Sequence, residues 1–248
     1  MTQAIPDFSV NDLTTQALYL EETWHSPRGR AIREVVFGGN DGLVTTLGFL
    51  MGVYGAIQDQ RIILIAGIAE AAAGAISMAT GAYLSSKAER EYYEREMHRE
   101  ICEMREKPEQ EREEVRRIYR AKGFEGTELE SVVHRITANP RVWLQCMMEE
   151  ELGLIAEPAS APVRAAAVMG LAFVAGAIVP LAPYFLLNGV AALAASVGCS
   201  VAALFLLGST KTTLTKTKWW MGGLEVVGLG MFACAVGYLV GRLVGALH

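Results

Sequence analysis

Long apolar runs and one charged stretch divide the chain. Five runs of about 20 residues or more carry few charged side chains, and this length is what an α-helix needs to cross a bilayer. The runs cover residues 35–57, 62–84, 163–187, 189–208 and 219–240. They predict an all-α, polytopic membrane protein with five transmembrane helices. Five buried helices of a soluble protein are the less favoured alternative. Residues 1–30 are polar and lack the apolar segment of a cleavable signal peptide.

The charged stretch lies between the second and third runs. Residues 87–151 contain 17 Glu and no Asp, together with 13 Lys plus Arg. Glu, Arg, Lys, Met and Ala dominate it, and these residues favour helix. We therefore expect a helical insert between spans 2 and 3. The expected domains are a polar N-terminal segment (1–30), spans 1–2 (31–86), a cytosolic helical metal-binding domain (87–162) and spans 3–5 (163–248).

Local signals predict where the helices of the insert begin and end. Pro108 suits a first helical turn, and Gly123 suits the position just after a helix. Thr127 with Glu130 resembles a capping box, and Asn139 precedes a proline at another helix start. The predicted helices are a continuation of span 2 to about residue 105, then 108–122, a third from 127 that stops before 140, and a fourth from 140 through 151.

Charge and composition set the orientation and exclude several functions. Lys and Arg precede span 1, flank spans 2 and 3 from within the insert, and lie between spans 4 and 5, so five spans can place these basic segments on the cytosolic side. The N-terminus and the insert are then cytosolic, and the C-terminus is on the far side. The net charge of −5 disfavours nucleic acid. The four cysteines form no zinc pattern, and no nucleotide-binding loop occurs, so we expect no enzyme and no prosthetic group.

The insert carries a pattern typical of metal binding. Two pairs of glutamates are spaced three apart, which places each pair on one side of a helix, and an M-M-x-x-E cluster follows. Carboxylates that converge cannot all stay ionised without cations, and thioether sulfur favours a transition metal. The candidate ligands are Glu100, Glu103, Glu111, Glu114, Met147, Met148 and Glu151. His98, His134 and Cys102 are alternatives, and we expect most other glutamates to form a solvated surface.

Ionisable side chains also occur inside the predicted spans. Asp41 lies in span 1, Glu70 in span 2 and Glu225 in span 5. Such groups are costly in a bilayer and usually functional, although Asp41 is close enough to the polar end to be an interfacial residue instead. Met78 lies two turns beyond Glu70. These residues indicate a path for a cation across the membrane.

In several segments the chain resembles the vacuolar iron transporter family. The resemblance rests on R-E-V-V-F-G-G-N-D-G-L-V at 33–44, on residues 70–83, on F-V-A-G-A-I-V-P-L at 173–181 and on G-G-L-E at 222–225. The insert resembles the cytosolic metal-binding domain of one subgroup through E-x-x-E, x₇, E-x-x-E and M-M-x-x-E-L-G-L. One departure is that both residues between Met148 and Glu151 are acidic, Glu149 and Glu150.

The resemblance implies a homodimer with five spans per subunit. It further implies export of Fe²⁺, and of Mn²⁺, from the cytosol in exchange for protons, with the metal as substrate and bound ion. The transport-pathway residues carried over are Asp41, Glu70 and Met78. We expect a bacterial plasma membrane, with a vacuolar membrane as the alternative. The rival interpretation is a membrane-anchored metal buffer or sensor that transports nothing.

Overall fold

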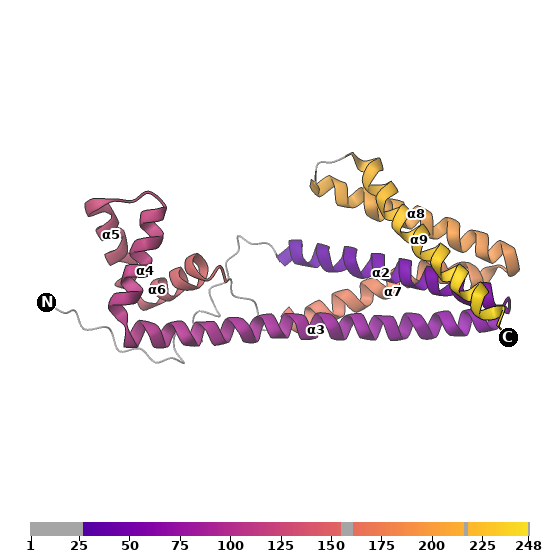
Figure 1. Cartoon of the computed structure of the whole chain (residues 1–248), viewed down its shortest axis with the longest axis horizontal. Coiled ribbons are helices and arrows are strands. Elements are labelled where there is room, and N and C mark those ends of the chain that lie inside the picture. Colours follow the sequence, from indigo (N-terminus) through magenta and orange to yellow (C-terminus); the bar gives the residue numbers. More distant parts are fainter. Residues whose placement is uncertain (1–26, 155–160, 216–217, 248) are drawn as a thin grey trace. The chain divides into compact units, whose positions relative to one another are not determined.

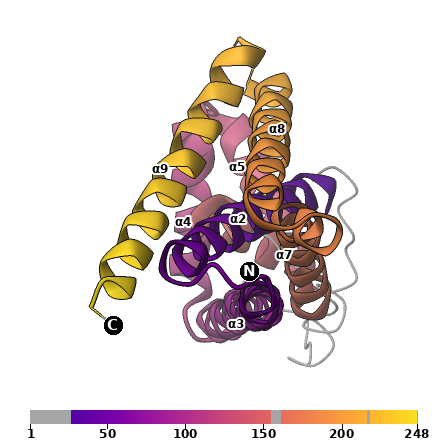
Figure 2. The ribbon, with the colours of Figure 1, turned by 90° about the vertical axis from the view of Figure 1, so that its right-hand side faces the viewer.

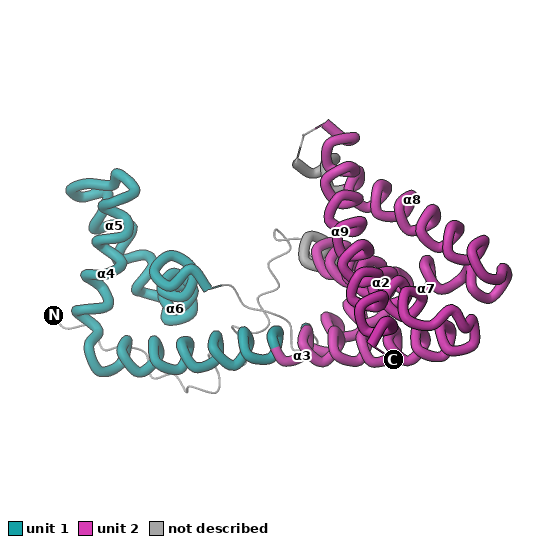
Figure 3. The backbone as a smooth tube through the Cα atoms, turned by 45° about the vertical axis from the view of Figure 1, so that its right-hand side comes forward, with its two compact units in different colours: residues 1–25, 85–161 teal, residues 26–84, 162–248 magenta. Residues whose placement is uncertain are grey.

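All described elements are helical, which confirms the all-α prediction. The computed structural model describes residues 27–154, 161–215 and 218–247. These residues divide into two compact units (Figure 3). We call residues 85–154 the acidic unit, and residues 27–84 with 162–247 the apolar unit. The division falls inside one helix, α3 (Gln60–Glu106), so the second apolar run continues into the charged stretch as predicted. Residues 1–26 of the predicted N-terminal segment lie outside the described residues.

Five helices build the apolar unit. They are α2 (Pro27–Ala56), the first part of α3, α7 (Ala161–Leu186), α8 (Gly189–Thr215) and α9 (Trp219–Gly245) (Figure 1). Within the described residues, four helices are long and apolar enough to cross a membrane: α3, α7, α8 over Gly189–Thr210, and α9. The 30-residue helix α2 is outside this set because Asn40, Asp41 and several glycines lower the hydropathy of its middle.

Helix α2 packs against α9 along a seam of small residues. A Cβ atom at Gly237 would collide with the Gly48 carbonyl oxygen, and one at Gly241 would collide with that of Gly52. At Gly245 an added Cβ would lie 2.9 Å from the Cα of Ala56. Small residues spaced four apart let two helix backbones approach closely. Because the numbers rise together on both helices, α2 and α9 run parallel.

Helix α2 is also in contact with the other helices of its unit, which surround it in the end-on view of Figure 2. Gly42 lies against the backbone of Phe173 in α7, and Leu50 lies against Gly67 of α3. Leu47 and Leu50 are fully buried in the unit's interior. The face of α2 that carries Gly48 and Gly52 meets α9.

Polar side chains fasten the ends of these helices. Asp59 Oδ1 accepts hydrogen bonds from the backbone N–H groups of Arg61 (2.8 Å) and Ile62 (3.1 Å), which caps the start of α3. Gln60 Nε2 donates to the carbonyls of Tyr184 (2.6 Å) and Leu187 (2.7 Å), which closes the end of α7. Terminal carbonyls without such partners would be costly in a membrane. Helix α7 continues through Pro180 and Pro183 as a single helix.

The acidic unit is a small helical domain around its own apolar core. It contains the end of α3, then α4 (Pro108–Ala121), α5 (Gly126–Thr137), α6 (Pro140–Cys146) and the π-helix η1 (Met147–Glu151). Trp143 and Val115 are buried at its centre. The other buried core residues are Met97, Ile101, Met104, Leu129, Val133, Ile136, Leu144, Cys146, Met147 and Met148.

Most predicted helix boundaries in the acidic unit are confirmed. Pro108 lies in the first turn of α4, Gly123 follows that helix with φ +97°, and Asn139 Oδ1 accepts from Arg141 N–H at 3.0 Å. The predicted capping box is wrong: α5 begins at Gly126 with Glu125 at the N-cap and no side-chain cap. Glu130 instead forms an ion pair with Arg116 of α4, which competes with the local interaction.

The predicted fourth helix changes type part of the way along. It is α-helical to Cys146 and π-helical from Met147 to Glu151, where Leu152 N–H donates to the Met147 carbonyl at 3.2 Å. A π-turn widens the helix and shifts the residues that follow it around the axis. This change covers the M-M-x-x-E motif, so it shifts the acidic residues of the motif around the helix axis.

Candidate metal centre

Three carboxylates from three different elements converge in the acidic unit. Glu100 comes from α3, Glu111 from α4 and Glu151 from η1. One carboxylate oxygen from each lies within 4.8 Å of the others. The fold thus brings together one member of each predicted glutamate pair and the glutamate of the methionine motif. Oxygen atoms at this spacing can share one cation.

Two of these carboxylates are buried and incompletely hydrogen-bonded. Glu100 is 1% exposed and Glu111 is 5% exposed. The Oε2 atom of each is buried without a hydrogen-bond partner. Burying an unpaired charge is costly, so such groups normally bind a proton or a cation. Glu151 is exposed, which leaves the cluster open to solvent on that side.

The electrostatics of the cluster favour uptake of positive charge. Burial, followed by the negative charges of Glu114 and Glu100, raises the pKa of Glu111 to about 7. Partial desolvation of its carboxyl group, followed by the charges of the same two neighbours, also raises the pKa of Glu151 to about 7. Burial, followed by the charge of Glu103, raises the pKa of Glu100. A divalent cation would relieve this repulsion and replace the protons.

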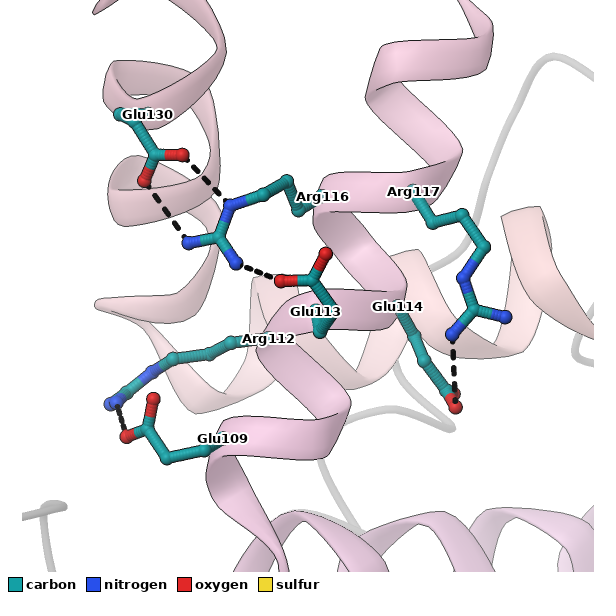
Figure 4. Close-up of polar contacts among 7 residues, drawn as sticks. All are labelled: Glu109, Arg112, Glu113, Glu114, Arg116, Arg117 and Glu130. Carbon is teal, nitrogen blue, oxygen red and sulfur yellow. Dashed lines mark hydrogen bonds and ion pairs between the residues drawn. The ribbon is translucent and has the colours of Figure 1, made fainter.

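The second member of each glutamate pair lies nearer to solvent. Glu103 is 3.8 Å from the Arg99 guanidinium, measured from Oε2 to Nε. Glu114 is 3.8 Å from Arg117, measured from Oε1 to Nη2, and Figure 4 shows this contact. The negative charges of both glutamates help to raise the pKa of Glu111.

The two methionines of the motif are deeply buried. Met147 is 0% exposed and Met148 is 2% exposed, and both belong to the apolar core with Met97 and Met104. They begin the π-helix that ends with Glu151. Their role as ligands stays a prediction.

The structure explains how one glutamate is selected from the run of three. Glu149 Oε1 accepts a hydrogen bond from Gln145 Nε2 at 2.9 Å. Glu150 pairs with Lys122 at 2.5 Å, from Oε1 to Nζ. Only Glu151 joins Glu100 and Glu111.

The alternative ligands and the other glutamates of the insert lie elsewhere. His98, His134 and Cys102 are exposed, and within the described part of the chain they do not belong to the carboxylate cluster. On the outer side of α4, arginines neutralise neighbouring glutamates (Figure 4). These ion pairs are Arg112–Glu109, Arg116–Glu113 and Arg116–Glu130. This surface matches the solvated face predicted from the sequence.

The apolar unit holds the predicted membrane carboxylates. Glu70 in α3 is half-buried, and its Oε2 accepts a hydrogen bond from the hydroxyl of Thr46 in α2 at 2.8 Å. Asp41 is half-buried one turn before Thr45, whose hydroxyl donates to the Asp41 carbonyl at 2.5 Å. Met78 is half-buried two turns beyond Glu70. These three predicted pathway residues thus lie on α2 and α3.

Sequence reasoning missed three residues that lie close to the predicted carboxylates, one in the apolar unit and two in the acidic unit. Thr46 is fully buried and touches Glu70, although a hydroxyl five residues after Asp41 in a span was a visible signal. Glu96 and Arg99 lie on the same helix as Glu100, and Arg99 contacts both Glu96 and Glu100. Neither was distinguishable among 30 charged residues of the stretch by type alone, since 17 Glu and 13 Lys plus Arg lie within residues 87–151.

These features define the class of protein: an integral membrane protein of packed helices with a carboxylate-rich helical unit suited to cations. The model of the VIT family matches residues 32–242. Vacuolar iron transporter 1 of Arabidopsis thaliana is 37% identical over 89% of this chain and 88% of its own. Vacuolar iron transporter 2 of Oryza sativa subsp. japonica is 34% identical over 96% and 98%. The vacuolar iron transporter of Toxoplasma gondii is 35% identical over 87% and 76%. The chain belongs to the VIT family.

The family assignment agrees with the resemblance seen in the sequence. The match begins just before the first motif and ends within α9, so it includes both units. The relatives are named as transporters and not as enzymes, which agrees with the prediction that the chain is not an enzyme.

Proposed function

We propose that this protein exports Fe²⁺, and also Mn²⁺, from the cytosol. The observation that carries the proposal is the convergence of Glu100, Glu111 and Glu151, two of them buried with unpartnered oxygens. In the proposal this cluster captures the ion, with Glu103 and Glu114 at its rim and Met147 and Met148 as soft ligands. Mixed oxygen and sulfur donors favour Fe²⁺ and Mn²⁺ over Mg²⁺ or Ca²⁺. The metal is the substrate.

We propose five membrane spans, with α2 as the first. The seam between α2 and α9 supports this assignment, because the two helices are parallel and remain in close contact from Gly48–Gly237 to Ala56–Gly245. A helix packed in this way against a spanning helix crosses the same layer. Residues 27–34 and the acidic unit are then cytosolic, and the chain ends on the far side. The membrane is a bacterial plasma membrane in our proposal and a vacuolar membrane in the alternative.

Asp41, Glu70 and Met78 form the proposed path through the membrane, with protons moving in the opposite direction. Carboxylates at membrane depth support this path, because they are costly in a bilayer and a helix that only anchors the protein does not need them.

We also propose a homodimer. The exposed face of α3 in the apolar unit supports it, since small side chains favour helix association in a bilayer. That face includes Ala69, Ala72, Ala73, Ser77 and Gly81.

The experiment that tests the proposal is metal flux into proteoliposomes. Purified protein is reconstituted, and Mn²⁺ entry is followed with a metal-quenched dye trapped inside. A transporter gives saturable entry that empty liposomes lack. A membrane-anchored buffer or sensor binds Mn²⁺ and gives no entry above that of empty liposomes.

The same vesicles test proton coupling. An imposed pH gradient, acidic on the side that receives the metal, should accelerate entry because protons leave as metal arrives. The reversed gradient should slow entry. Flux that ignores both gradients would remove antiport and leave a uniporter.

A further inference from the structure

Arg99 places a positive charge at the edge of the carboxylate cluster. Its guanidinium lies 2.7 Å from Glu96 Oε2, 3.4 Å from Glu100 Oε1 and 3.8 Å from Glu103 Oε2. Two of these three carboxylates are among the residues proposed to hold the ion. The third, Glu96, is not. Arg99 therefore lies between a non-ligand carboxylate and two proposed ligands.

The contacts of Arg99 differ in strength and burial. The shortest is to Glu96, whose side chain is 11% exposed, while that of Arg99 is 51% exposed. The contact to Glu100 uses Oε1 only, and Oε2 stays without a hydrogen-bond partner. A half-exposed arginine can move at little cost, and its guanidinium stays charged at all accessible pH values. The charge can therefore approach Glu100 and Glu103, or withdraw towards Glu96.

We propose that Arg99 is a built-in competitor of the metal ion. With the site empty, its guanidinium partly neutralises Glu100 and Glu103. When an ion binds, Arg99 remains paired with Glu96, and its charge repels the ion. Arg99 thus holds the affinity low and the release fast, which suits a site that must pass its ion onward. This inference rests on the proposed function of the cluster.

The expected effect follows from the charge that is removed. A unit charge about 5–6 Å from a divalent ion, in surroundings close to bulk water, changes the affinity by about tenfold, and salt reduces this effect. Arg99→Gln should therefore bind Mn²⁺ about tenfold more tightly and release it correspondingly more slowly. Arg99→Lys keeps the charge on a different head group, so its affinity for Mn²⁺ should lie between those of the wild type and Arg99→Gln.

The matched control is Arg90→Gln. Arg90 is on the same helix and pairs with Glu94 at 2.7 Å, from Nε to Oε1, and neither residue is a proposed ligand. The variant therefore makes the same change in charge about two and a half turns from Arg99. Its Mn²⁺ affinity should equal that of the wild type.

The experiment uses the full-length protein in detergent at pH 8, above the pKa of about 7 of Glu111 and Glu151. Calorimetry with Mn²⁺ measures the affinity, and stopped-flow transfer of Mn²⁺ to a fluorescent chelator measures release. A Glu100→Ala protein reports binding elsewhere in the chain. Tighter binding and slower release in Arg99→Gln, both reduced at high salt and absent in Arg90→Gln, support the inference. Unchanged or weaker binding in Arg99→Gln overturns it. If Glu100→Ala binds as many ions as the wild type, the capture site itself is wrong.

Discussion

At the scale of single residues, the acidic unit depends on carboxylates held in an unfavourable state. The pKa of Glu111 and that of Glu151 are each raised to about 7, because desolvation and neighbouring negative charges oppose ionisation. A glutamate in water has a pKa near 4.3. In the metal-free fold these groups therefore retain protons that the unfolded chain has already lost. These two groups therefore contribute stability to the metal-free fold that is fully present below about pH 4.5 and is lost as the pH rises through about 7.

Metal binding should show the opposite pH dependence. Ligand carboxylates bind metal only when deprotonated, so below pH 7 the ion must displace protons from Glu111 and Glu151. The Mn²⁺ affinity of the full-length protein should fall by up to about tenfold for each group per pH unit below 7, and should level off above pH 8. Calorimetry in buffers with different ionisation enthalpies should detect protons released at pH 6.5 and almost none at pH 8.5. Equal affinity at both pH values would contradict the raised pKa values.

Thr46 is a residue-scale test within the apolar unit. Its hydroxyl is buried and donates to Glu70 Oε2 at 2.8 Å. A hydrogen bond to a charged group contributes about 1.5–3 kcal/mol, and it also fixes the direction of the carboxylate. Thr46→Val keeps the volume and removes the donor, so it should lower the Mn²⁺ flux about tenfold or more. Thr46→Ser keeps the donor and should restore most of the flux. Equal flux in the Val and Ser variants, with both proteins monodisperse, would show that the hydrogen bond has no role in transport.

At the scale of elements, the close approach of α2 and α9 depends on glycine. Any side chain at Gly241 meets the backbone of Gly52, which cannot move without moving the helix. Gly228 is also on α9, and an added Cβ there would meet nothing within 4 Å. The two glycines therefore separate packing from backbone flexibility within one helix.

Gly241→Ala should destabilise the protein, and Gly228→Ala should not. Overpacking typically costs about 1–3 kcal/mol, whereas alanine in an open helical position gains up to about 1 kcal/mol over glycine. Thermal unfolding in detergent, followed by tryptophan fluorescence, compares the two variants. A lower midpoint for Gly241→Ala with an unchanged or higher midpoint for Gly228→Ala is expected. Equal midpoints would mean that α2 and α9 do not meet at this seam.

The elements also show what the sequence could predict and what it could not. Pro108 and Gly123 act through their own backbone geometry, and Asn139 acts through a hydrogen bond to a residue two positions away, so the boundaries that they mark were predictable. The capping box at Thr127 failed because Glu130 has a better partner 14 residues away, Arg116. Likewise, spacing placed the glutamates in pairs along each helix. Tertiary packing and a π-turn decide which of these glutamates meet across three elements, and no local sequence pattern predicts either one.

At the scale of the whole molecule, the number of spans determines the side on which the chain ends. Five spans place residues 27–34 and the C-terminus on opposite sides of the membrane, and four spans place them on the same side. With five spans, a reporter fused to the N-terminus should be active on the same face as the acidic unit, and one fused after residue 248 only on the opposite face. Activity of the N-terminal reporter on the face opposite to a reporter inserted in the α4–α5 loop, near Gly123, would contradict five spans. Gly123 suits the insertion because it lies in an exposed turn between the two helices.

The most direct test of the account joins its two carboxylate sites in one assay. Initial rates of Mn²⁺ entry into proteoliposomes are measured over a range of Mn²⁺ concentrations for wild type, Glu100→Ala and Glu70→Ala. Glu100→Ala should lose flux mainly at low Mn²⁺, because capture is impaired while the path remains. Glu70→Ala should abolish flux at every concentration while the full-length protein still binds Mn²⁺ at the acidic unit. Wild-type flux in Glu70→Ala would contradict the account and move the path away from α2 and α3.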